Sequence, residues 1–244
     1  MEGTAPSMAF YTDFAGHYDA VFPLRPEVLA FLGRMLPEDG RLLDVGCGTG
    51  ACCGHLATPV RPCLGIDLDP GMIDQAEDRY PGAEFRILGM QEIGLLPAGE
   101  FSAVICLGNV LPHLPLASLP GFLSAVHRLL RPGGAWVFQT VNFDPILKRR
   151  GHVFPVIRVP GQGLAFHRAY ENVTPGQLDF VTALTDPDQV VFRGRETLYP
   201  LSSVSYRALH VPAQWQPVLH DGDFNARPFD PATDSGSVWV WRRR

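Results

Sequence analysis

The sequence predicts a doubly wound α/β fold, in which helices cover both faces of a mostly parallel sheet. Strand-length apolar segments alternate with helix-length amphipathic segments over roughly the first 140 residues. A glycine-rich turn follows the first predicted strand and precedes a predicted helix. The segment FSAVICL at 101–107 is apolar at positions that face both sides, as expected of a central parallel strand.

Size and charge restrict the class of protein. The chain has 244 residues, of which 46% are hydrophobic and 18% are charged, so one large domain with a sizeable core is expected. The formal net charge is -5. Because a nucleic-acid binder usually carries a basic surplus, we expect no nucleic-acid partner.

The cysteines and the N-terminus bear on location. The five cysteines are Cys47, Cys52, Cys53, Cys63 and Cys106. They form no CxxC pair, which disfavours a zinc cluster, and reduced thiols in a cytoplasmic protein fit best. No apolar run approaches the ~18 residues of a membrane helix. The first residues lack a basic start followed by an apolar core, so neither a signal peptide nor a membrane partner is expected.

Two helices are predicted before the sheet. Residues 8–22 carry an aromatic stripe at helical spacing, formed by Phe10, Phe14, Tyr18 and Phe22. The stripe is expected to pack on the body of the protein. In a functional interpretation, Tyr11 or Tyr18 closes over a ligand. After two prolines, residues 27–36 read as an amphipathic helix.

The alternating units then follow. Strands are predicted at 41–45, 63–66, 84–88, 101–107 and 135–140. Helices are predicted at 49–57, 70–79 and 116–130, and Pro70 suits the first turn of the second of these. Helical crossovers between successive strands place the strands parallel to one another.

The pattern changes after residue 141. Antiparallel strands are predicted at 153–159, 164–170, 178–185 and 189–198, where β-rich pieces are separated by Pro and Gly. We interpret them as an inserted sheet or lid. A short helix at 201–209 and strands at 215–219 and 238–241 are expected to return to the main sheet and close it.

The glycine turn, DVGCGTG at 44–50, indicates a ligand site. Gly46, Gly48 and Gly50 have no Cβ, so a ligand can lie against the backbone. The turn also permits a dinucleotide fingerprint, with Asp67 placed as the ribose-binding acid, so an NAD-dependent enzyme is an alternative. Asp44, two residues before the turn, disfavours a pyrophosphate and favours a cationic ligand.

Four segments in this order resemble the class I S-adenosylmethionine-dependent methyltransferases: DVGCGTG, GIDLD at 65–69, FSAVICLGNVLPHL at 101–114 and LLRPGGAWVF at 129–138. The resemblance implies a Rossmann-like, seven-stranded sheet and S-adenosylmethionine as cofactor, to which the pattern after residue 141 adds the inserted antiparallel β lid. The cofactor-binding residues it implies are Asp44, Gly46, Cys47, Gly48, Gly50, Asp67, Leu68, Met72, Met90, Gln91, Leu107 and Asn109. Many relatives place an acid after the third strand to bond the adenine amino group. Here that position reads Gly-Met-Gln.

The methyl acceptor is expected to be a small molecule. LGNVLPHL at 107–114 and VNFD at 141–144 resemble the glycine and sarcosine N-methyltransferases, which implies an amine or amino-acid-like acceptor. His113 is the candidate catalytic base. The candidate substrate residues are Tyr11, Tyr18, Asn142, Arg168 and Tyr170. An arginine in the lid can pair with a substrate carboxylate.

Each of these residues also has a structural interpretation. Asn142 would hold a turn, His113 would cap a helix or fill the wall of the site, and Arg168 would be a solvated strand residue. Three other functions stay open: an O- or C-methyltransferase, an NAD-dependent oxidoreductase and a non-catalytic cofactor-binding protein. The oligomeric state is also open, and a homodimer that contacts through the lid is one arrangement.

A single domain, 1–244, is expected to contain four segments. An N-terminal helical cover occupies 1–36 and the cofactor-binding core 37–141. The lid and substrate region follows at 142–200, and the C-terminal segment at 201–244 closes the sheet.

Overall fold

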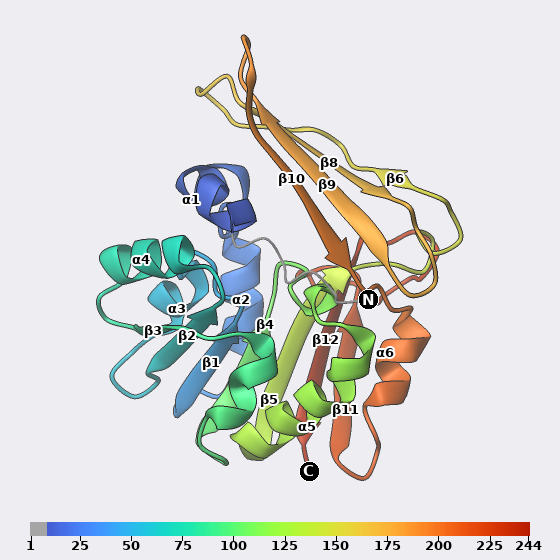
Figure 1. Ribbon diagram of the computed structural model, residues 1–244. Coiled ribbons are helices and arrows are strands. Elements are labelled where there is room, and N and C mark those ends of the chain that lie inside the picture. Colours follow the sequence, from blue (N-terminus) through green and yellow to red (C-terminus); the bar gives the residue numbers. More distant parts are fainter. Residues whose placement is uncertain (1–8) are drawn as a thin grey trace.

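The computed structural model describes the backbone of residues 9–244 and the side chains of residues 14–244. Its main sheet has seven strands in the order β11-β12-β5-β4-β1-β2-β3 (Figure 1). The strands are β1 (Arg41–Val45), β2 (Cys63–Asp67), β3 (Glu84–Ile87), β4 (Phe101–Cys106), β5 (Leu130–Val141), β11 (Trp215–Asp221) and β12 (Gly236–Arg243). The strand β12 runs in the opposite direction to the other six strands of this sheet. The predicted doubly wound, mostly parallel fold is confirmed.

The strand order reverses at the centre of the sheet. The chain runs outward from β1 through β2 to β3 and then returns, so that β4 pairs with the other side of β1. In open α/β sheets a reversal of this kind leaves a crevice at the carboxyl ends of the central strands. The glycine turn after β1 and the segment after β4 both reach this crevice.

Helices cover both faces, each over its own apolar core. Three helices, α2 (Pro26–Met35), α3 (Ala51–Leu56) and α4 (Pro70–Arg79), pack against the side of β4 that carries Ala103 and Ile105. The 3-10 helix η1 (Met90–Leu95), α5 (Leu119–Leu129) and α6 (Ser203–Leu209) pack against the opposite side, which carries Val104 and Cys106. Both faces of β4 are therefore buried, as its sequence predicts.

Local sequence sets several helix boundaries. The side chain of Asp69 accepts a hydrogen bond from the Met72 amide at 3.0 Å, and Pro70 occupies the first turn, so α4 begins where expected. The predicted helix at 116–130 is divided. Its first residues form the 3-10 helix η3 (Leu116–Ser118), and α5 begins one residue before Pro120. Another 3-10 turn, η2 (Leu111–His113), follows β4.

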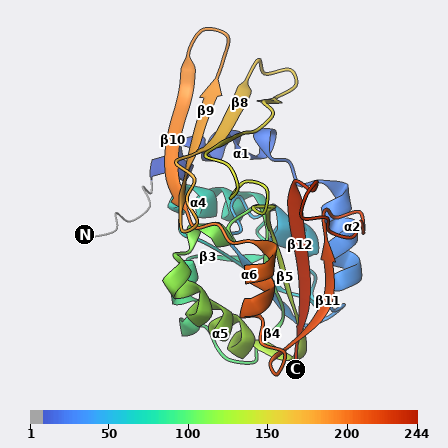
Figure 2. The same cartoon turned by 90° about the vertical axis from the view of Figure 1, so that its right-hand side faces the viewer.

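The inserted strands form a second, antiparallel sheet that stands above the first (Figures 1 and 2). Its strands are β6 (His152–Val153), β7 (Ile157–Arg158), β8 (Ala165–Glu171), β9 (Leu178–Thr185) and β10 (Val190–Leu198). The predicted strand at 153–159 is split into β6 and β7 because Pro155 cannot donate to a ladder. We call this sheet the lid.

The N-terminal helix α1 (Ala9–Val21) lies between the lid and the main sheet. Phe14 of α1 stacks on Phe166 of β8 and on Phe192 of β10, with ring centroids 4.9 and 5.5 Å apart. Asp19 of α1 forms an ion pair with Arg79 of α4 and accepts a hydrogen bond from Thr49. The helix therefore joins the lid to the glycine turn.

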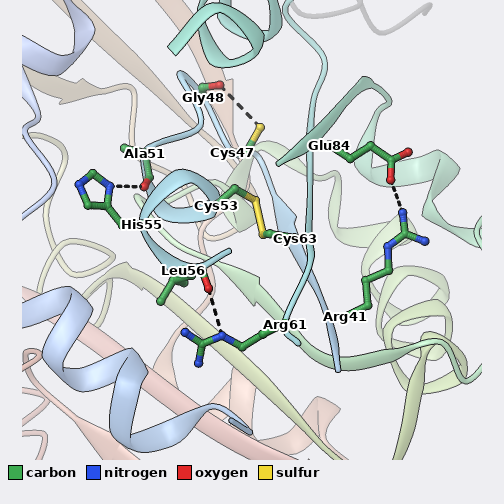
Figure 3. Close-up of a disulfide and its surroundings, with 10 residues drawn as sticks. All are labelled: Arg41, Cys47, Gly48, Ala51, Cys53, His55, Leu56, Arg61, Cys63 and Glu84. Atoms are coloured by element: carbon green, nitrogen blue, oxygen red, sulfur yellow. Dashed lines mark hydrogen bonds and ion pairs between the residues drawn. A yellow bond between two sulfur atoms is a disulfide. The ribbon is translucent and has the colours of Figure 1, made fainter. Parts of the chain in front are cut away.

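The expectation that the cysteines are reduced thiols is wrong for two of the five. A disulfide joins Cys53 of α3 to Cys63 at the start of β2, with 5.4 Å between their Cα atoms (Figure 3). Both residues are buried, and α3 packs against β2, so two cysteines ten positions apart meet in the core. The free cysteines are Cys47, Cys52 and Cys106. Sequence spacing did not predict this pair.

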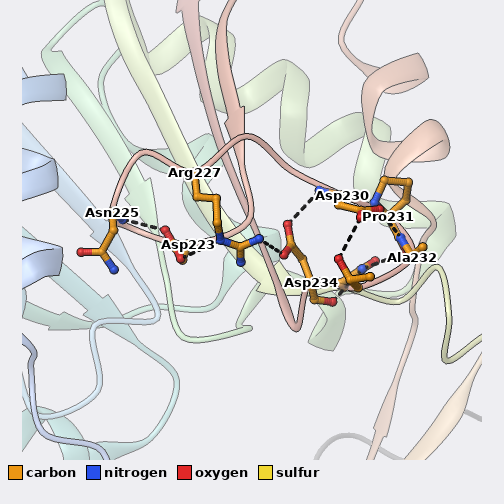
Figure 4. A network of polar contacts seen from close by, with 9 residues as sticks. Asp223, Asn225, Arg227, Asp230, Pro231, Ala232 and Asp234 are labelled. Carbon is orange, nitrogen blue, oxygen red and sulfur yellow. Dashed lines mark hydrogen bonds and ion pairs between the residues drawn. The ribbon is translucent and has the colours of Figure 1, made fainter.

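The loop between β11 and β12 is held by charged groups (Figure 4). Arg227 forms ion pairs with Asp223 and with Asp234, and the Asp230 amide donates to Asp234 at 2.8 Å. In the described part of the chain, no helix is both long and apolar enough to cross a membrane. The expected cytoplasmic location stays a prediction.

Candidate active site

Two cavities meet at the carboxyl ends of β1, β2 and β4. The small cavity, about 160 Å³, lies over the end of β2 and includes Gly46, Gly48 and Asp67 in its lining. The large cavity, about 600 Å³, lies beneath the lid and α1. Four residues line both: Tyr18, Gly46, Gly108 and His113. A ligand in the small cavity would therefore border a second ligand in the large one at this junction.

The glycine turn presents its backbone to both cavities. Gly46 has φ +72, and a Cβ there would lie 2.4 Å from Val110. Gly48 has φ +53 and lies below the ring of Tyr18, where a Cβ would be 3.5 Å from the ring. The left-handed backbone favours glycine at both positions, and at Gly46 the close approach of Val110 also leaves no room for a Cβ. The turn thus fits a ligand that lies directly against the main chain.

Gly50 has a different surrounding from the other two glycines. It lines neither cavity, and a Cβ there would lie 2.7 Å from both Ala76 and Phe85. It is the N-terminal cap residue of α3 and has φ +79. The structure therefore explains Gly50 by close packing of the turn against α4 and β3 rather than by contact with a ligand.

Two carboxylates lie near the junction, the buried Asp44 and the half-buried Asp67. Asp67, at the end of β2, accepts hydrogen bonds from the amides of Gly48 at 2.9 Å and Asp69 at 3.0 Å. Burial nevertheless raises the pKa of Asp67. Burial and the charge of Asp67 raise the pKa of Asp44 to about 7. No cationic side chain of the described residues lowers either pKa, so these carboxylates favour a ligand that brings positive charge.

The far end of the small cavity is largely apolar. Leu68, Met72 and Met90 line it together with Gln91, which is the polar side chain of that wall. The nearest acid in sequence, Glu92, accepts a hydrogen bond from the Gly89 amide at 3.0 Å and closes the first turn of η1. A flat aromatic group bound here would contact thioether and aliphatic carbons, and Gln91 offers an amide.

The large cavity has an aromatic wall. Its rings come from α1 and the residue after it, from the lid, and from the β11–β12 loop: Phe14, Tyr18, Phe22, Phe154, Phe166, Tyr170, Phe180 and Phe224. Asp44, Cys47, Leu107 and Asn109 also line this cavity, although the resemblance implies cofactor roles for them. They lie on its floor, where the large cavity borders the small one.

Two titratable groups at the junction are strongly shifted by burial. Burial lowers the pKa of His113 to about 4, so the imidazole is neutral at pH 7 and only weakly basic. Burial also raises the pKa of Tyr18 far above its usual value, so the phenol stays protonated. Both side chains can hydrogen-bond a neutral group at the junction. A role for His113 as catalytic base stays a prediction.

The predicted substrate residues do not all reach the large cavity. Tyr18, Arg168 and Tyr170 line it. Asn142 does not, because its amide donates to the carbonyls of Pro231 at 3.1 Å and Asp234 at 2.9 Å and holds the loop before β12. Tyr11 belongs to α1, and its side chain falls outside the described residues.

Sequence reasoning also missed three residues of the site. Glu196 of β10 is buried and lines the small cavity, Gln139 of β5 accepts a hydrogen bond from the Gly108 amide at 2.9 Å, and Phe154 lines the large cavity. The period of two along β10 was a usable signal for Glu196, because the alternate positions Phe192 and Leu198 are buried on the same face.

Comparison with known proteins gives the class. Residues 42–134 match the family model described as "Methyltransferase domain". The chain is 33% identical to a malonyl-[acyl-carrier protein] O-methyltransferase from Serratia marcescens over 130 residues, which are 52% of this chain and 49% of that protein. The chain thus spans about half the length of the curated relatives it matches.

Solved structures share the whole fold. The CcbJ methyltransferase from Streptomyces caelestis superposes with a TM-score of 0.78 at 18% identity, covering 97% of this chain and 99% of that one. The sugar N-methyltransferase KedS8 from Streptoalloteichus superposes with a TM-score of 0.66 at 24% identity, covering 100% of this chain and 96% of that one.

Fold, cavity and family match agree on the class. Residues 42–134 form a methyltransferase domain, as the resemblance to the class I S-adenosylmethionine-dependent methyltransferases predicts, and the solved structures share its fold. The family match supports S-adenosylmethionine rather than a dinucleotide as the cofactor, and its contact with the glycine turn stays a prediction. The finer resemblance to the glycine and sarcosine N-methyltransferases stays a prediction.

Proposed function

We propose that the protein transfers the methyl group of S-adenosylmethionine to a small molecule held in the large cavity. The observation that carries this proposal is the junction, where Tyr18, Gly46, Gly108 and His113 border both cavities. A donor in one cavity and an acceptor in the other would meet there with little water between them. Such alignment is most of what methyl transfer needs from a protein.

The residues of the small cavity suit this cofactor. Asp67, at a strand end, would accept hydrogen bonds from the two ribose hydroxyls, and Leu68 and Met72 would flank the adenine. Asp44 would lie near the positive charges of the methionine part. S-adenosylmethionine supplies an already activated methyl group. The protein is then left to orient the acceptor and exclude water.

An amine is the acceptor that the junction favours. A neutral amine attacks through its own lone pair and can lose its proton afterwards, so a strong base is unnecessary. His113 has a pKa of about 4 and is a weak base, but its neutral imidazole can accept a hydrogen bond from an amine N–H. Removal of the amine from water also favours its uncharged form over its ammonium.

A hydroxyl acceptor is the second candidate. It needs a base, and the carboxylate of Asp44 lines the large cavity. The Serratia relative is named as an O-methyltransferase, whereas KedS8 is named as a sugar N-methyltransferase. The residues matched in that relative amount to only about half of this chain.

Incubation with methyl-labelled cofactor and matched acceptors separates the two candidates. Benzylamine and benzyl alcohol, then ring-substituted pairs, differ only in the atom offered to the methyl group. We expect label in N-methyl products, identified by mass spectrometry. Transfer only to hydroxyl or carbon acceptors would contradict the amine assignment. Cofactor binding without transfer to any acceptor would instead indicate a non-catalytic protein.

A further inference from the structure

The inner face of the lid carries an arginine in apolar surroundings. Side chains alternate along β8, so Phe166, Arg168 and Tyr170 share one face, and all three line the large cavity. Across the ladder, Arg168 is paired with Thr182 of β9. The outward positions of β8, His167 and Glu171, are exposed. Arg168 is therefore a cationic group that the lid turns toward the acceptor.

Aromatic rings flank the guanidinium on two sides. Its central carbon lies 4.9 Å from the centroid of Phe154 and 5.7 Å from that of Phe22. The Nε atom is buried and has no hydrogen-bond partner among the described residues. No carboxylate of that part of the chain affects the pKa of this guanidinium. Arg195, on the neighbouring strand β10, instead forms ion pairs with Glu171 and Asp179 on the exposed side of the lid.

This arrangement costs free energy unless an anion completes it. A guanidinium stays charged in proteins, and burial lowers the pKa of Arg168. The two rings offset part of the desolvation by cation–π attraction. The rings do not accept hydrogen bonds from the guanidinium N–H groups as oxygen atoms do. The Nε atom therefore remains without an acceptor among the described residues. A carboxylate matches the fork of a guanidinium with two parallel hydrogen bonds.

We propose that Arg168 binds an anionic group of the methyl acceptor, a carboxylate or a phosphate, between the rings of Phe22 and Phe154. The proposal rests on the proposed function, because it assigns the large cavity to the acceptor. The acceptor is then a bifunctional molecule, with an anion at the lid and a nucleophilic atom at the junction.

The anion is the anchor and not the atom that is methylated. Arg168 lines only the large cavity, whereas the residues of the junction line both. A carboxylate that accepts two N–H bonds is also a weaker nucleophile than a free one, because the guanidinium stabilises its negative charge. The product is therefore methylated at the junction end and keeps its free anion.

Binding of simple anions tests the proposal without any turnover. Benzoate and phenyl phosphate are the probes, benzyl alcohol is the neutral probe, and all three are titrated by calorimetry into protein saturated with S-adenosylhomocysteine. We expect at least one anion to bind wild type about tenfold or more tightly than Arg168→Met, with Arg168→Lys between them. Arg193→Met, at an exposed position of β10, is the matched control and should bind like wild type. Benzoate and phenyl phosphate distinguish a carboxylate site from a phosphate site.

A matched pair of acceptors extends the test to catalysis. The anionic acceptor is para-(aminomethyl)benzoate, and the neutral one is para-methylbenzylamine. For wild type we expect a KM that is lower for the anionic acceptor by about tenfold or more. Arg168→Met should remove this difference with little change in kcat.

Three outcomes distinguish a failure of the proposed anion site at Arg168, the anchor, from a failure of the proposed function. Equal anion binding by wild type and Arg168→Met, with cofactor affinity intact in both, would overturn the anchor and leave the proposed function standing. A methyl ester as the product would also overturn the anchor. A wild-type protein that does not bind the cofactor would instead contradict the proposed function.

Discussion

Asn109, in the turn after β4, donates a hydrogen bond from its side-chain amide to the hydroxyl of Tyr170 on the lid strand β8, at 3.2 Å. The same Asn109 side chain accepts a hydrogen bond from the Val141 amide at 2.9 Å, where the main sheet ends and the lid begins. One side chain therefore links the floor of the large cavity to its roof. Because Asn109 has φ +65, its backbone adopts a conformation that asparagine tolerates better than most residues.

Tyr170→Phe should weaken the link while keeping the ring. The ring packs against Phe143 and Phe180, with centroids 5.8 and 5.5 Å away, so the core of the lid is retained. We expect a loss of about 1 kcal/mol in the free energy of unfolding and a KM for the acceptor that rises severalfold. The affinity for S-adenosylhomocysteine should not change. Denaturant titration, steady-state kinetics and calorimetry measure the three. Tyr199→Phe, just after β10, is the control. An acceptor KM that Tyr170→Phe leaves unaltered would show that the hydrogen bond between Asn109 and Tyr170 does not position the lid.

Cofactor affinity should depend on pH through Asp44. The folded protein holds the Asp44 proton up to a pKa of about 7, whereas the unfolded chain releases it at about 4. The stability contribution of this group is thus present below about pH 4 and is lost as the pH rises through about 7. The positive charges of S-adenosylmethionine favour the ionised carboxylate, so binding should strengthen from about pH 6 to about pH 8 and release a proton.

Calorimetry in buffers of different ionisation enthalpy measures that proton. Asp44→Asn should bind more weakly at about pH 8, with an affinity that varies less with pH. Its apo form should lose less thermal stability than wild type between about pH 5 and about pH 8. Equal pH dependence in wild type and Asp44→Asn would show that another group titrates.

Reduction of the disulfide should destabilise the cofactor half of the sheet. Cys53 and Cys63 close a short loop that joins α3 to β2, the strand that ends at Asp67. Loop closure of this size is worth about 3 kcal/mol in a chain-entropy account. We expect a lower Tm in dithiothreitol for wild type and no effect of dithiothreitol on Cys53→Ala/Cys63→Ala. Alkylation of the unfolded, unreduced protein followed by mass spectrometry should label only Cys47, Cys52 and Cys106. Labelling of every cysteine would contradict the disulfide.

The sequence predicted the regular elements well because their signals are local. Pro70 marks the start of α4, and the Pro and Gly residues that bound the β-rich segment at 178–185 give the full length of β9. The prediction is less accurate where pairing with a residue distant in sequence sets the boundary of an element. The Pro132-Gly133-Gly134 turn suggested that the fifth strand begins at Ala135, but Leu130 pairs with Phe101 of β4, so β5 begins five residues earlier.

In the candidate active site, too, residues in local motifs were predictable and contacts between distant segments were not. The glycine turn and Asp67 each belong to a motif at the end of a predicted strand, and the structure brings them together because β1 and β2 are parallel neighbours. Arg168 was a candidate from its place in the lid, but its surroundings were not predictable. Phe22 follows α1 and Phe154 lies between β6 and β7, so only the folded chain shows that rings rather than carboxylates surround the guanidinium.

Titration of S-adenosylmethionine and of NADH into the purified protein tests the central claim most directly. The account predicts that S-adenosylmethionine binds and NADH does not. It also predicts that Asp67→Ala weakens S-adenosylmethionine binding by about 1.5–3 kcal/mol, the value of hydrogen bonds to a charged group. Thermal unfolding of the apo variant controls for the two amide bonds that Asp67 accepts. Tight binding of NADH without affinity for S-adenosylmethionine, or an Asp67→Ala variant that binds S-adenosylmethionine as wild type does, would contradict the account.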